Sequence, residues 1–153
     1  MRREKKRPAA FLFAVILIGG AALHAYWALG GTRFLSTAAG LEAGTEFQMT
    51  PLIIAVTWLF VAGMLLAVVL ALGRVGLIGR RIPQKIYAIG LWGVTICAAG
   101  GALMNFLTPR AWDRFLFGPI FLLLFVLSLI LALPQEEEGR RRRASGRRSS
   151  AER

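Results

Sequence analysis

Residues 52–72 read LIIAVTWLFVAGMLLAVVLAL, and this stretch decides the fold. It runs for 21 residues without a Lys, Arg, Asp or Glu. A helix needs about 20 apolar residues to cross a hydrocarbon core about 30 Å thick. Because backbone groups in lipid must be hydrogen-bonded within their own segment, the stretch predicts a transmembrane helix.

Three further stretches have the same character, at about residues 9–31, 86–107 and 115–133. The chain is 56% hydrophobic and only 18% charged, whereas a soluble domain is usually about 45–50% apolar and about 25% charged. The sequence therefore predicts an all-α fold, a four-helix transmembrane bundle over residues 9–133. A basic stub, 1–8, precedes it, and a charged tail, 134–153, follows it.

The charges predict how the bundle is oriented. The formal charge of +11 could suggest a nucleic-acid partner, but such a protein spreads its charge over a folded surface, and here the charge is segregated. Sixteen of the 19 basic residues lie in the stub, the loop at 73–85 and the tail. The positive-inside rule places these three segments, and so both termini, in the cytoplasm. We therefore expect no nucleic-acid partner.

The same basic residues have two interpretations. They are either orientation signals alone, which we favour, or also a surface for anionic lipid head groups. The candidates are Arg2, Arg3, Lys5, Lys6, Arg7, Arg80, Arg81, Arg140, Arg141, Arg142 and Arg143. The tail that holds the last four has few apolar residues and is expected to be disordered.

Two features of the ends of the spans carry predictions. A cleaved signal peptide is the rival interpretation of the N-terminus, but the apolar run is too long and lacks an A-x-A site between Ala14 and Gly31. Pro119 lies one turn inside the fourth span. It should either kink that helix or mark its true start.

Small residues repeat every four positions on two spans, a pattern that lets membrane helices approach closely. The helix-packing candidates are Gly63 and Ala67 in the second span and Gly93, Cys97 and Gly101 in the third. The fourth span is mostly Leu and Phe. We therefore expect the first three helices to pack tightly and the fourth to cover them with more exposure to lipid.

Polar and amphipathic residues within the spans gather toward the predicted outer side. They define a candidate outer-half pocket: His24, Tyr26, Trp27, Trp58 and Asn105. Intramembrane polar residues carry a functional hypothesis by default. The alternative, which we favour, is that Tyr26 and Trp27 belong to an interfacial aromatic belt, while His24 and Asn105 form hydrogen bonds between helices.

The sequence argues against most catalytic chemistry. Cys97 is the only cysteine, so the chain cannot form an internal disulfide. With one histidine and no acidic residue in the four predicted spans, we expect no metal site and no cofactor. No recognisable nucleophile motif pairs a serine with a histidine and an acid. A non-enzymatic protein is favoured.

The segment His24-Ala25-Tyr26-Trp27-Ala28-Leu29-Gly30-Gly31 resembles the H-x-Y-W-A-x-G-G signature of a bacterial membrane family, domain of unknown function 3995. The run from Asn105 through Trp112 to Pro119 also resembles it. The resemblance covers about residues 9–133 and implies a four-span bundle in a bacterial plasma membrane. It supplies no activity, and it favours reading His24, Tyr26 and Trp27 as one unit.

Three functions remain open on this basis. The first is a multi-pass protein that binds a small or lipid-like molecule in the outer half or associates with a membrane partner. The second is a transporter or channel subunit that works as a homo-oligomer, because four helices without charged lining make a poor pore. The third is a lipid-modifying enzyme with His24 as base. The shape of the interior should discriminate among them.

Overall fold

The computed structural model describes residues 3–39, 47–79 and 81–134, and their regular structure is helical. Its elements are α1 (Arg3–Ala28), α2 (Leu35–Ala38), α3 (Pro51–Arg74), α4 (Gln84–Leu107), the π-helical turn η1 (Asp113–Phe117) and α5 (Gly118–Ala132). Within the described ranges, four helices are long and apolar enough to cross a membrane. The all-α class and the four spans are thereby confirmed.

The helix ends follow local sequence chemistry. Thr50 caps α3, with its Oγ1 accepting a hydrogen bond from the Ile53 amide at 3.4 Å, and Pro51 takes the first helical position. Helix α4 ends at Leu107, immediately before Thr108-Pro109. Pro119 occupies the first turn of α5, so it marks a helix start, although η1 extends the helical path back to Asp113.

The predicted stub differs in one respect. Helix α1 already begins at Arg3 and runs through Pro8, so described residues of the stub are helical. Proline lacks an amide proton, so Pro8 cannot make the helical hydrogen bond to the Glu4 carbonyl, and α1 continues through it in its second turn. The predictions for Arg2, Arg80, Arg140–Arg143 and a disordered tail concern positions outside the described residues.

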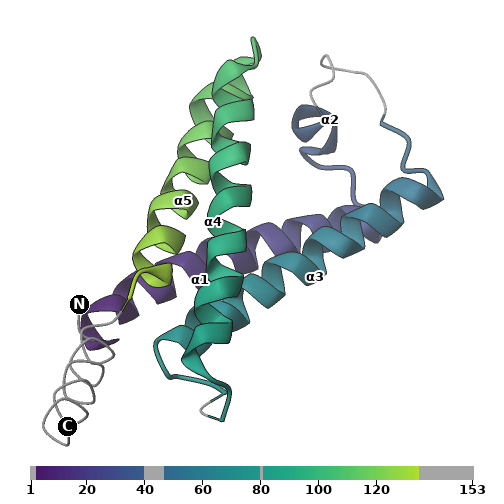
Figure 1. Ribbon diagram of the computed structural model, residues 1–153. Helices are drawn as coiled ribbons and strands as arrows, with labels where there is room; N and C mark the ends of the chain where they lie inside the picture. The colour runs from purple at the N-terminus through teal and green to yellow at the C-terminus, as the bar shows by residue number, and fades with distance from the viewer. Residues whose placement is uncertain (1–2, 40–46, 80, 135–153) are drawn as a thin grey trace, which may run out of the picture.

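The four spans form two antiparallel pairs, α1 with α3 and α4 with α5 (Figure 1). We call "inner" the end that holds the start of α1, the loop after α3 and the end of α5, and "outer" the opposite end. The pairs meet toward the inner end and diverge toward the outer end, as Figure 1 shows. The shared apolar core draws on all four helices in their inner halves. It includes Phe13, Val68, Leu91 and Leu131.

This pairing departs from the expectation that the first three helices pack tightly and the fourth only covers them. The contact between α4 and α5 is built by reciprocal aromatic and glycine positions. A Cβ at Gly101 would stand 2.5 Å from the Phe121 ring, and one at Gly118 would stand 2.9 Å from the Phe106 ring. The prediction failed because it counted small residues without counting the aromatic side chains of α5 that could fill them.

Candidate functional site

The inner ends of three helices are joined through one buried arginine. Arg74, at the end of α3, is 1% exposed. Its Nε donates to the Leu131 carbonyl at 3.1 Å, Nη2 to the Leu133 carbonyl at 3.1 Å and Nη1 to the Gln84 carbonyl at 3.3 Å. The last carbonyls of a helix lack helical partners. Arg74 therefore satisfies the end of α5 while holding the start of α4.

Lys6 of α1 joins the same junction. Its Nζ donates to the Leu133 carbonyl at 2.8 Å, and the side chain is 1% exposed. We call Lys6, Arg74 and Leu133 the inner junction. Sequence reasoning counted both cations only as orientation or lipid-binding charges. In the sequence, a cation that caps a neighbouring helix looks the same as one that faces lipid head groups.

The other basic residues described near this end are exposed. Lys5 and Arg7 lie on the first turns of α1, Arg81 lies in the loop before α4, and Lys85 lies in the first turn of α4. Each keeps its charge in reach of a head-group layer if this end faces the cytoplasm. The cations thus divide into two structural classes, buried at the inner junction and exposed around it.

Tyr87 fixes the loop between α3 and α4. It is 2% exposed, and its hydroxyl donates to the Gly79 carbonyl at 3.0 Å. Its ring fills the space that a Cβ on Gly73 would need. Gly79 has a φ of +61°, which suits glycine. Tyr87 was not among the predicted site residues, although an aromatic residue across a short loop from a glycine is a pattern that the sequence shows.

Two of the five candidate pocket residues contact one another in the outer half. His24 and Trp27 have ring centroids 5.1 Å apart, and Phe60 of α3 lies 6.1 Å from His24. The His24 Nδ1 is 2.8 Å from the Gly20 carbonyl of its own helix. Trp27 is 7% exposed and donates from Nε1 to the Arg33 carbonyl at 2.8 Å. Trp27 therefore anchors the outer loop to α1.

The other three candidates lie apart from this cluster. Tyr26 is 42% exposed and packs against Gly31, and Trp58 is 42% exposed on α3. Asn105 lies on α4, in the other helix pair, and donates from Nδ2 to the Gly101 carbonyl at 2.7 Å. His24 and Asn105 thus bond within their own helices, not between helices as the alternative interpretation supposed.

A hydrogen bond between two side chains of different described spans joins Thr95 of α4 to Ser128 of α5. Their hydroxyl oxygens are 3.0 Å apart, and both side chains are buried. Thr95 Oγ1 is also 2.7 Å from the Leu91 carbonyl, so its single proton is shared between two acceptors. This bond fixes α4 against α5, which agrees with their close pairing.

The five helix-packing candidates differ in whether another side chain packs against them. Ala67 is 4% exposed in the shared core, and Gly101 packs on Phe121. A Cβ at Gly63 or Gly93 would meet no further heavy atom within 4 Å in the described structure, and Cys97 is exposed. Ala67 and Gly101 are therefore packed, whereas Gly63, Gly93 and Cys97 are open.

The outer loop spans the space between the diverging pairs. Trp27 holds it at Arg33, and Arg110, beyond the end of α4, donates from Nη1 to the Ala39 carbonyl at 3.3 Å. Arg110 is fixed in turn by Asp113, with Nε 2.8 Å from Oδ2. Figure 1 shows α2 between the outer ends of the two pairs.

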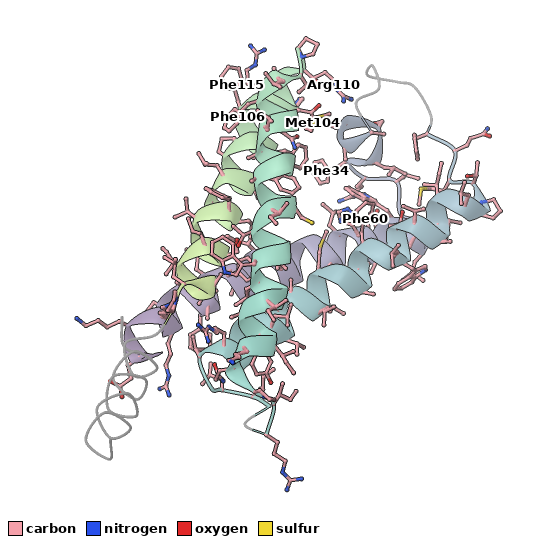
Figure 2. The ribbon with its side chains drawn as sticks, viewed as in Figure 1. Phe34, Phe60, Met104, Phe106, Arg110 and Phe115 are labelled. Atoms are coloured by element: carbon pink, nitrogen blue, oxygen red, sulfur yellow. The ribbon has the colours of Figure 1, made fainter. Side chains whose placement is uncertain are left out.

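Apolar side chains from three elements face this space. Phe34 before α2, Phe60 on α3 and Met104 on α4 lie on sides that face one another in Figure 2. They are 72%, 58% and 71% exposed. We call the space between the facing sides of α3 and α4, beside Phe34, Phe60 and Met104, the outer opening.

No protein-family model, curated protein or solved structure matches this chain. The resemblance at His24–Gly31 to the family named above stays a prediction from those residues. In the part of the chain that the structure describes, no three His, Cys, Asp or Glu side chains gather as a metal site would require. Any function proposed for this protein must be compatible with its arrangement, in which an apolar opening lies on the outer side of a hydrogen-bonded junction.

Proposed function

We propose that this multi-pass membrane protein holds a lipid-like molecule, an alkyl chain with a small head group, in the outer opening. The observation that carries the proposal is the divergence of the two pairs above a shared inner core. Phe34, Phe60 and Met104 present apolar surface to the space between them. An alkyl chain would cover that surface with dispersion contacts to both pairs.

The inner junction favours binding over passage. Arg74 and Lys6 tie α1, α3, α4 and α5 together at the inner end through hydrogen bonds of 2.8–3.3 Å. A transport path would have to break these bonds, whereas an outer ligand leaves them intact. An opening in the outer half also matches what a lipid-modifying enzyme would need, but the hydrogen bond of His24 to Gly20 gives it no described acidic partner.

The orientation and the membrane belong to the same proposal. Placing the inner end in the cytoplasm of a bacterial cell puts the exposed Lys5, Arg7, Arg81 and Lys85 at the anionic inner surface. Each such cation contributes about 1 kcal/mol of attraction to anionic lipid head groups. Reporter fusions at both termini should read cytoplasmic, and an external signal from either one would contradict this orientation.

Lipid retention tests the binding proposal. The protein is purified in a mild detergent, and co-purifying phospholipid and fatty acid are measured by native mass spectrometry. Gly63→Phe should fill the outer opening and reduce the retained lipid. Leu65→Phe is the matched control, because Leu65 is 47% exposed and lies two residues from Gly63, on the opposite face of α3. Equal retention by both variants and the unmodified chain would contradict the proposal.

A further inference from the structure

Helices α3 and α4 contact each other in one antiparallel register at the inner end. The Tyr87 ring lies on Gly73, and a Cβ at Gly90 would stand 2.7 Å from Leu70 Cδ1. In an antiparallel pair, a step outward along α3 is matched by an equal step outward along α4. Each of these two contacts sets a large side chain against a glycine, which brings the backbones close.

The same register can be followed outward by whole heptads, which return to the same face of each helix. One heptad beyond the contact of Leu70 with Gly90, it sets Gly63 opposite Cys97. A second heptad sets Val56 opposite Met104. In the structure these four positions are open: Gly63 would meet nothing within 4 Å, Cys97 is exposed, and Val56 and Met104 are 42% and 71% exposed.

We propose that the outer halves of the two helix pairs close on each other about the inner junction, continuing this register so that Gly63 packs against Cys97. The inner half of the contact is already formed, with a glycine opposite a larger residue, and the outer half repeats that complementarity. Membrane helices gain packing where small residues admit a neighbour. Closure therefore extends a contact that exists and creates no new kind of interface.

The fold supplies both the fixed end and the moving end. The inner junction and the shared core hold the four helices together at one end. At the other end the polar side chains of α1 and α4 are satisfied within their own helices, His24 on Gly20 and Asn105 on Gly101. No described hydrogen bond between spans at that end has to be broken for the two pairs to approach.

The outer loop must move as the pairs close, because it is attached to both. Trp27 holds it to α1 through Arg33, and Arg110 holds it through Ala39. Phe34 lies in the space that closure would fill (Figure 2) and has a left-handed φ of 61°. Its side chain is 72% exposed, so its withdrawal costs little packing.

The native Cys97 makes a direct test possible, because it is the only cysteine in the chain. Gly63→Cys is introduced into the full chain in phospholipid vesicles, and the vesicles are treated with copper phenanthroline. A disulfide requires Cα atoms within about 7 Å, so it traps the closed form. We expect both thiols of the monomer to be lost, as read by maleimide–polyethylene glycol counting.

Leu65→Cys is the matched control, at nearly the same depth on the opposite face of α3 and 47% exposed. It should keep both thiols under the same oxidation. Equal loss in the two variants would overturn the proposal, and so would an unchanged pair of thiols in Gly63→Cys. A disulfide that forms only between two chains, seen as a dimer on a non-reducing gel, would assign the seam to a second copy and would also overturn it.

A second measurement needs no added cysteine. Gly63→Phe should hold the pairs apart and speed the labelling of Cys97 by N-ethylmaleimide relative to the unmodified chain, whereas Leu65→Phe, on the opposite face of α3, should leave the rate unchanged. Equal rates in all three would contradict closure. The inference does not rest on lipid binding: a trapped disulfide together with unaltered lipid retention would support closure and reject the proposed ligand.

Discussion

The inner and outer halves of the molecule differ in where their polar side chains form hydrogen bonds. In the inner half, polar side chains bond across helices: Arg74 and Lys6 reach α5, and Tyr87 reaches the loop after α3. In the outer half, His24 and Asn105 bond to carbonyls four residues earlier in their own helices. Along the contact of α3 with α4, Gly73 and Gly90 are packed, whereas Gly63, farther out, is open.

This difference shows where the bundle is fixed and where it is free. A polar group that bonds across helices sets their separation, whereas one that bonds within its helix leaves the separation to packing alone. The outer separation is therefore governed by whatever fills the space, either an alkyl chain or the opposite helix. Four substitutions can break or sharpen the comparison.

Arg74→Ala should have the largest effect on stability. It leaves the carbonyls of Leu131 and Gln84 without this donor, whereas Lys6 still donates to the Leu133 carbonyl, and an unsatisfied buried group costs about 1–3 kcal/mol. We expect a loss of about 3 kcal/mol or more in the free energy of unfolding in detergent. Arg81→Ala, an exposed change at the same end, should stay within about 0.5 kcal/mol. Comparable losses for the two variants would show that the hydrogen bonds of the inner junction do not stabilise the bundle.

Gly101→Ala should have the next largest effect. Its Cβ would overlap the ring of Phe121, and overpacking of this kind costs about 1–3 kcal/mol. Gly100→Ala, one residue away, meets open space and should be close to neutral. Thermal unfolding of the two variants compares a packed and an open glycine on the same helix. A cost at Gly100 as large as that at Gly101 would contradict the pairing of α4 with α5.

Thr95→Val and Ser128→Ala should each have a smaller effect. Both remove one hydroxyl from the bond that joins α4 to α5. Polar contacts between membrane helices average about 0.6 kcal/mol in double-mutant cycles. The cycle built from the two single variants and the double variant should give a coupling near that value. A coupling of zero would mean that each hydroxyl is satisfied by its own helix.

The spans were predictable because each is long, apolar and free of charge over its central stretch. The helix starts at Pro51 and Pro119 were predictable because proline restricts the backbone in a known way. The partner of each helix was not predictable from small-residue spacing. The pairing depends on which large side chain packs against which glycine. The contacts of Phe121 with Gly101 and of Phe106 with Gly118 are seen only when α4 lies beside α5.

The site was predictable in part for similar reasons. His24 and Trp27 are three residues apart on one helix, so their contact follows from helical geometry. Asn105 lies on another span, and its distance from them depends on the divergence of the pairs. Arg74 was overlooked because a cation at the end of a span has the same sequence signature whether it faces head groups or caps a neighbouring helix.

The central claim is that the two pairs are joined at the inner end and separable at the outer end. Paired spin labels in nanodiscs test it most directly, with Cys97→Ser as the background. Labels replacing Leu52 and Leu107 report the outer ends of α3 and α4, and labels replacing Lys5 and Leu133 report the inner ends of α1 and α5. We expect one short, narrow distance distribution for the two inner labels. For the two outer labels we expect a broad or two-peaked distribution with a long component. A single short, narrow distribution at both ends would describe a closed parallel-sided bundle and would contradict it.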